Sequence, residues 1–143
     1  MRKFYTSALG LKETSVAGDK WLLEGPSRRL ILSKGTAKKL SYTGFCAKDD
    51  TQLIKIRDYI VKGGGMPIEN PSPLIQQGGF ALRDPDNNLL CFGVSNQPSC
   101  STAGLDGRLQ HVVVATANLQ EMMKYYQKTL ITFKRHAKVQ ANY

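Results

Sequence analysis

The chain has 143 residues, 41% of them hydrophobic, which is enough for one compact domain with a core and too little for two full-sized ones. No apolar run reaches the length of about 18 residues that a membrane span needs, and the basic start leads into a polar segment, so neither a transmembrane segment nor a secretory signal is expected. The net charge of +9 comes from basic residues scattered along the chain, which disfavours a nucleic-acid-binding face. We therefore expect a cytoplasmic protein that binds neither membranes nor nucleic acid.

The cysteines also narrow the class of protein. Their number, three, is odd, and none of them stands in a Cys-x-x-Cys pair, which argues against a disulfide framework or a zinc site. Cys46 and Cys91 lie in apolar, strand-like runs and are expected to be buried thiols, whereas Cys100 lies in a polar stretch and is expected in a loop.

The chain begins with the pattern of a helix followed by three strands. Residues 2–9 place their apolar side chains on one face, and Gly10 follows as a helix stop. Residues 11–16, 20–24 and 28–32 are short runs of strand propensity separated by glycine and proline, which predicts a three-stranded meander.

The same pattern restarts near residue 42 and is complete there. Residues 42–48 predict a strand, and Asp49 to Thr51 offer capping side chains to an amphipathic helix that three glycines, Gly63 to Gly65, bring to an end. Residues 66–69, 79–83 and 89–94 predict three further strands. This second unit therefore has the order strand, helix, three strands, and the first unit is the same unit without its first strand.

A third start follows a polar linker. Residues 109–116 predict a valine-rich strand, Asn118 a helix cap, residues 119–130 an amphipathic helix and residues 132–139 another strand. The triplet Lys124-Tyr125-Tyr126 matches Lys3-Phe4-Tyr5 at the beginning of the chain, and Leu130 then matches Leu9. We expect a paired unit over residues 1–97, a linker over 98–107 and the opening of a further unit over 108–143.

One segment carries a family resemblance. Residues 80–92, FALRDPDNNLLCF, resemble the closing strand pair of the vicinal oxygen chelate superfamily, which includes glyoxalases, bleomycin-resistance proteins and extradiol dioxygenases. Asn87 stands where that family prefers glycine in the turn, and it is the next most tolerant residue of left-handed geometry. Residues 42–64 and 108–130 resemble the strand and helix that open a module. The resemblance implies an α+β fold of paired βαβββ modules, most like the N-terminal part of a two-domain extradiol dioxygenase.

The resemblance also implies where a metal would be bound. Extradiol dioxygenases hold Fe(II) or Mn(II) with two histidines and a carboxylate. His111 stands at the first ligand position, but Tyr42 and Cys91 stand where histidine and glutamate are usual. The only other histidine, His136, lies among basic residues and is expected at the surface. A complete ligand set therefore cannot be assembled, and the sequence as it stands favours His111 as a half-buried strand histidine over a metal ligand.

Three functions remain open on these grounds. The first is a fragment or shortened relative of a metal-dependent extradiol dioxygenase, an oxidoreductase, with His111 as a metal ligand. The second is a metal-free protein that binds a small aromatic or hydrophobic molecule in the cup of its sheet, where Tyr42 and Cys91 would line the cavity. The third is a truncated domain without activity. Because the first module lacks a strand, we expect residues 109–116 to cover its open edge, either in the same chain or by strand exchange in a homodimer.

Overall fold

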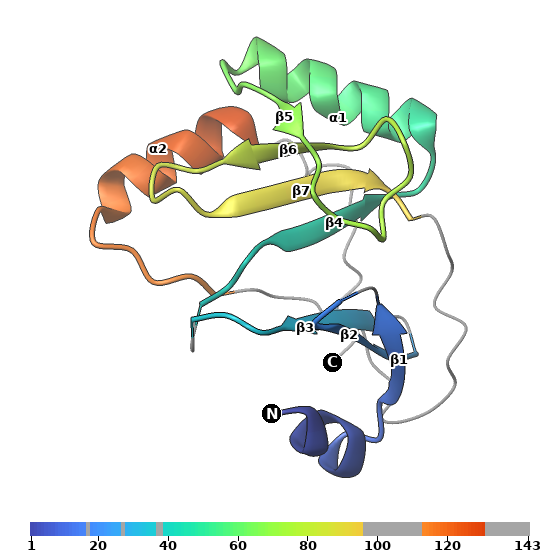
Figure 1. Cartoon of the computed structure of the whole chain (residues 1–143). Coiled ribbons are helices and arrows are strands. Elements are labelled where there is room, and N and C mark those ends of the chain that lie inside the picture. The colour runs from blue at the N-terminus through green and yellow to red at the C-terminus, as the bar shows by residue number, and fades with distance from the viewer. Residues whose placement is uncertain (17, 27, 37–38, 96–112, 131–143) are drawn as a thin grey trace, which may run out of the picture. The chain divides into compact units, whose positions relative to one another are not determined.

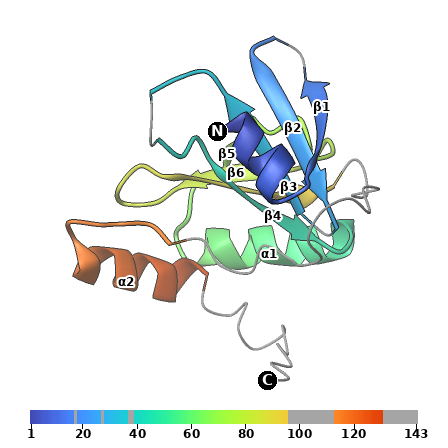
Figure 2. The same cartoon turned by 90° about the horizontal axis from the view of Figure 1, so that it is seen from below.

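The computed structural model describes residues 1–16, 18–26, 28–36, 39–95 and 113–130 (Figures 1 and 2). The described residues up to 39 form one compact unit, and residues 40–95 with 114–130 form a second. Both units combine helix and strand, so the predicted α+β class is confirmed at that level. Within the described ranges, no helix combines the length and apolar character needed to cross a membrane.

The first unit is a short helix followed by a three-stranded antiparallel sheet in the order β1-β2-β3. The helix is a π-helical turn, and Gly10 leaves it with a φ of +64°, which explains why glycine is needed at this stop. Arg2 connects the helical turn to the sheet. Its guanidinium forms an ion pair with Glu13 of β1 and stacks over the ring of Trp21 of β2, at 4.5 Å from the ring centroid. The elements are η1 (Phe4–Ala8), β1 (Lys12–Val16), β2 (Lys20–Gly25) and β3 (Arg28–Ser33).

The second unit has a four-stranded sheet in the order β4-β7-β6-β5 (Figure 1). The first strand, β4, lies parallel to the last, β7, and the other neighbours are antiparallel. A parallel neighbour requires a crossover, and the helix α1 provides the first part of it. The elements are β4 (Thr43–Ala47), α1 (Asp50–Lys62), β5 (Ile68–Glu69), β6 (Phe80–Arg83), β7 (Leu89–Val94) and α2 (Leu119–Thr129).

Helix α1 forms where the sequence predicts it. The Asp49 side chain accepts a hydrogen bond of 2.8 Å from the backbone nitrogen of Gln52, which satisfies a free donor at the helix start. Gly63 ends the helix, and its backbone nitrogen donates to the Tyr59 carbonyl oxygen. The buried residues of α1 follow a helical period and face the sheet: they are Leu53, Ile56 and Ile60.

Both helices of the second unit lie over one face of its sheet and meet near their C-terminal ends, where Gly63 lies against Lys128 (Figures 1 and 2). Three aromatic rings stack across neighbouring strands of this sheet. The ring centroid of Phe92 in β7 lies 5.3 Å from that of Phe80 in β6 and 5.2 Å from that of Phe45 in β4. Tyr126 and Leu130 of the α2 segment pack against the same cluster. Its buried members are Ala47, Leu53, Ile56, Ile60, Phe80, Leu82, Leu90 and Phe92.

One predicted strand is wrong over part of its length. Residues 113–116 form no strand, and Val113 is 93% exposed. The Thr116 hydroxyl accepts a hydrogen bond of 3.0 Å from the backbone nitrogen of Asn118, so the chain here turns into the helix cap instead of continuing as extended backbone. Asn118 caps α2 as predicted. Residues 109–112, the linker over 98–107 and the strand predicted over 132–139 lie outside the described residues.

Candidate functional site

The parallel pairing of β4 with β7 brings two of the predicted site residues together. Tyr42 immediately precedes β4, and the register places Thr43 opposite Leu90 and Gly44 opposite Cys91. Leu90 belongs to the core beneath the helices, so the alternation of side chains directs Cys91 to the opposite face of the sheet. By the same alternation Tyr42, two residues before Gly44, belongs to the face of Cys91, and we take this face as the candidate site.

The Tyr42 side chain is half-buried, but its hydroxyl oxygen is fully buried and completes no hydrogen bond of good geometry. Burial raises the pKa of Tyr42, and the hydroxyl of Ser72 nearby offsets only part of that increase. The phenol is therefore neutral at physiological pH, and it is a hydrogen-bond donor that lacks an acceptor. A buried donor without a partner costs about 1–3 kcal/mol.

The Cys91 thiol is also held in its neutral form. Its residue has no exposed surface, and burial raises the pKa of the thiol to about 11. A thiol with such a pKa is a poor nucleophile and a poor metal ligand at neutral pH, because both roles require the thiolate. Cys46, by contrast, is exposed, so the prediction that it is buried is wrong: β4 is the end strand of the sheet and has a neighbouring strand on one side only.

A loop between β5 and β6 lies over the same face as Cys91. Ile75 of this loop packs onto Gly79 and Gly93 so closely that a Cβ atom at either glycine would collide with it. The loop is fixed by the backbone nitrogen of Gln76, which donates to the Val94 carbonyl oxygen at 2.8 Å. The sequence analysis assigned this segment only to a proline-rich connection, because nothing local shows which face such a loop will cover.

A metal ion does not fit the residues at this face. Fe(II) and Mn(II) in such sites are held by imidazole and carboxylate groups. Tyr42 and Cys91 instead present a neutral phenol and a neutral thiol. Across the described residues, no three histidine, cysteine, aspartate or glutamate side chains are close enough to hold a metal ion. His111, the predicted ligand, and His136 lie outside the described residues.

A second constellation of polar groups surrounds Asp84 in the turn between β6 and β7. Its buried carboxylate accepts hydrogen bonds from the backbone nitrogens of Asp86 and Asn88, from the Asn88 side chain and, at 3.0 Å, from the Tyr126 hydroxyl. Burial raises the pKa of Tyr126, and the hydrogen bond to Asp84 raises it further. Asn87 has a φ of +65°, as expected for a residue in place of glycine.

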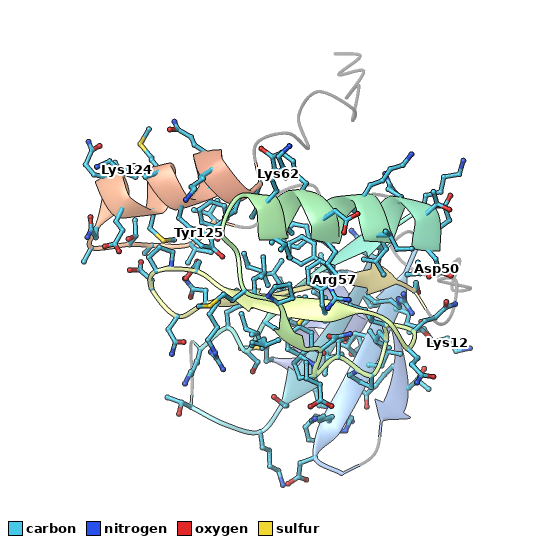
Figure 3. The ribbon with its side chains drawn as sticks, turned by 90° about the horizontal axis from the view of Figure 1, so that it is seen from above. Lys12, Asp50, Arg57, Lys62, Lys124 and Tyr125 are labelled. Atoms are coloured by element: carbon cyan, nitrogen blue, oxygen red, sulfur yellow. The ribbon has the colours of Figure 1, made fainter. Side chains whose placement is uncertain are left out.

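The tyrosine pair of α2 thus anchors that helix to the turn. Figure 3 labels Tyr125, which projects from α2 toward the sheet. Beside the Tyr126 contact, the Tyr125 hydroxyl donates to the Arg83 carbonyl oxygen at 3.0 Å. The sequence analysis recognised the turn from its Asp-Pro-Asp pattern but did not connect it with the tyrosines. The sequence signal that could have linked the helix to the turn is the pair of adjacent aromatic residues in this amphipathic helix.

The different environments of the two described thiols predict different reactivities. Alkylation of the native protein with iodoacetamide at pH 8 is expected to modify Cys46 and leave Cys91 unmodified, because only the former is exposed. Peptide mass mapping after denaturation and a second, isotopically distinct label would locate both. Labelling of Cys91 at the rate of Cys46 would contradict its burial.

The raised pKa of Cys91 also predicts a dependence of stability on pH. The native thiol has a pKa of about 11 against 9.0 for the free side chain, so folding favours the protonated form. Its contribution to the free energy of unfolding is complete below pH 9 and declines as the pH rises to about 11. Urea unfolding of the wild type and the Cys91→Ala variant across this range should show a shallower decline in the variant. Parallel curves would contradict the shift.

Comparisons with known proteins add little to this geometry. No protein-family profile and no curated protein matches the chain. Among solved structures, it is similar to an integron cassette protein of V. cholerae, at 23% identity over 64% of this chain and 80% of that chain, with a TM-score of 0.27. A protein from the mobile metagenome of V. pseudocholerae shares 24% identity over 63% and 79% of the two chains, with a TM-score of 0.27. A virulence protein of Salmonella typhimurium shares 19% over 63% and 81%, again with a TM-score of 0.27.

Proposed function

We propose that this chain is a vicinal oxygen chelate type of protein that binds a small aromatic or hydrophobic molecule without a metal ion. The observation that carries the proposal is that Tyr42 and Cys91 belong to the same face of the sheet and that burial raises the pKa of both groups, which favours their neutral forms. They occupy the positions at which the family resemblance implies metal ligands. A neutral phenol beside a neutral thiol suits an uncharged organic ligand better than a cation.

The unsatisfied Tyr42 hydroxyl supports a ligand with a hydrogen-bond acceptor. Its oxygen is buried without completing a hydrogen bond, so an acceptor on a bound molecule would recover the energy lost on burial. Cys91 has no exposed surface, so it lies beneath this face and adds no charge to it. The proposed ligand is therefore a small aromatic or hydrophobic molecule that carries a carbonyl, ether or phenol oxygen.

Metal analysis and ligand titration together test this proposal. The purified chain is expected to contain Fe and Mn far below one ion per chain, and to bind phenol or catechol measurably by calorimetry. The Tyr42→Phe variant removes only the donor and should weaken that binding about three- to tenfold, as expected for one hydrogen bond. The Tyr59→Phe variant, in α1, is the matched control and should leave the affinity unchanged. Equal affinities in wild type and Tyr42→Phe would refute the role of the hydroxyl.

A second candidate is a relative of the extradiol dioxygenases whose metal site is completed elsewhere. The observation that favours it is α2, which begins at the Asn118 cap where a further module was predicted to open, shortly after His111. This candidate predicts about one Fe(II) or Mn(II) bound per chain, oxygen uptake with catechol, and loss of both in a His111→Ala variant. Strand exchange between two chains through residues 109–112 stays a separate prediction. Sedimentation at several protein concentrations would test it.

A further inference from the structure

The surface on which α2 lies is a specific site for a helix. We call it the helix-docking surface and define it by the Asp84 carboxylate, the Arg83 carbonyl oxygen, the end of α1 at Gly63 and the adjacent core. The approach is close: a Cβ atom at Gly63 would lie 2.6 Å from the Lys128 carbonyl oxygen. The contacts of α2 with this surface come from five positions of one helical face: Met122, Tyr125, Tyr126, Thr129 and Leu130.

The beginning of the chain repeats those five positions in register. The residue 121 positions earlier in the chain matches each of the five in size or polarity. These earlier residues are Met1, Phe4, Tyr5, Ala8 and Leu9. Two of the five pairs are identical and lie at the centre of the contact. Tyr5 matches Tyr126, which donates to Asp84, and Leu9 matches Leu130, which packs on the core. A third, methionine, is identical at the position buried in α2.

The aromatic pairs of the two segments also have the same arrangement, although η1 is a π-helical turn and α2 is an α-helix. The rings of Phe4 and Tyr5 meet edge to face at 5.4 Å with an interplanar angle of 77°. Those of Tyr125 and Tyr126 do the same at 5.6 Å and 86°. An aromatic pair of the same shape is thus presented by both helical segments.

Two apolar side chains of the N-terminal segment, Met1 and Phe4, are largely unused in the first unit, whereas Tyr5 and Leu9 are half-buried. Met1 is 81% exposed and Phe4 is 58% exposed, and η1 has no buried residue. Arg2 and Lys3 make this segment basic, whereas the docking surface carries the carboxylates of Asp84 and Asp86. The exposed segment and the surface are therefore complementary in shape and in charge.

We propose that residues 1–9 of a second copy of this chain dock onto the helix-docking surface in place of α2. Tyr5 of the incoming copy donates its hydroxyl to the Asp84 carboxylate, and Leu9 packs where Leu130 lies. Phe4 lacks the hydroxyl by which Tyr125 reaches Arg83, so the incoming segment binds more weakly than α2. The chain therefore associates through this surface to the extent that α2 is released from it.

A labelled peptide tests the exchange on the full-length chain. The receptor is the double variant Tyr126→Phe and Leu130→Ala, in which α2 is weakened while Asp84 is intact. A fluorescein-labelled peptide with the sequence of residues 1–10 should bind this receptor at least about tenfold more tightly than the wild-type chain, because α2 competes with it in the latter. A peptide of residues 118–130 is the positive control and shows that the surface of the variant is folded.

Two altered peptides decide whether the match of residues matters. Tyr5→Phe in the peptide should weaken binding about three- to tenfold, and Leu9→Ala by a similar factor. Thr6→Ala, which matches the exposed Gln127, should leave it unchanged. Equal binding of the parent and Tyr5→Phe peptides, or equal binding to the variant and the wild-type chain, overturns the proposal.

A milder variant gives an independent test that needs no peptide. In sedimentation experiments, the chain with Tyr126→Phe alone should dimerise at lower concentration than the wild type. Adding Tyr5→Phe to it should return the association to the wild-type level. A dimer that persists in the double variant contradicts the role of the N-terminal segment.

Discussion

The Asp84→Ala variant is expected to lose about 3 kcal/mol of unfolding free energy, a large part of the stability of a small domain. The substitution removes the acceptor of four hydrogen bonds and leaves their donors, including the Tyr126 hydroxyl, without partners in a buried environment. Since the same carboxylate anchors α2, the helix should also be released. Urea unfolding followed by circular dichroism measures the loss, and hydrogen exchange of the α2 amides measures the release.

Asp86→Ala is the matched control for that experiment. It removes the same charge from the same turn, but Asp86 is exposed and its carboxylate accepts none of the four hydrogen bonds. We expect a change within about 0.5 kcal/mol. A loss in Asp86→Ala as large as in Asp84→Ala would mean that the charge of the turn matters and the buried network does not.

The Gly93→Ala variant is expected to be destabilised by about 1–3 kcal/mol, because its methyl group would occupy the space of the Ile75 side chain and approach Gly79. Combining it with Ile75→Ala should relieve the collision. The double variant is therefore expected to be less destabilised than the sum of the two single variants, with a coupling of about 1 kcal/mol or more. Additive losses would show that the loop does not pack on this face as described.

The same pair of substitutions bears on the proposed binding site. Ile75 lies over the face of the sheet to which Cys91 belongs, so the loop that carries it restricts access to that face. If the ligand binds there, Gly93→Ala should alter affinity for phenol or catechol in addition to stability. Comparison with Tyr59→Phe, in α1 on the opposite face of the sheet, separates the local effect from a general one.

Local patterns in the sequence were sufficient for most of the elements. Helix α1 is set by the Asp49 cap, its buried apolar period and the glycines that follow, and all three signals act within a few residues of one another. Strand β7 was predicted with the bounds that the structure gives, Leu89–Val94, because an apolar run follows a turn that Pro85 and Asn87 define. Such signals do not depend on the rest of the chain.

The prediction over residues 113–116 shows where local patterns fail. Valine-rich sequence favours a strand, but a strand needs a neighbour to satisfy its backbone groups, and propensity alone does not supply one. Here the Thr116 hydroxyl bonds to the backbone of Asn118 and starts the entry into α2 instead. Cys46 is the corresponding error in burial, because an apolar strand at the end of a sheet exposes side chains that the same sequence would bury at its centre.

The repeat between Lys3-Phe4-Tyr5 and Lys124-Tyr125-Tyr126, the Asp-Pro-Asp turn and the order of helices and strands were determined by the sequence itself, since each depends on neighbours along the chain. Tertiary structure alone decided that Tyr42 and Cys91 share one face of the sheet, and that Tyr126 donates a hydrogen bond to Asp84. Strand register and helix packing bring together residues that are far apart in the chain, and burial raises the pKa of Tyr42, Cys91 and Tyr126. The elements follow from local chemistry, whereas the site exists only where the sheet and the helices bring distant side chains into one environment.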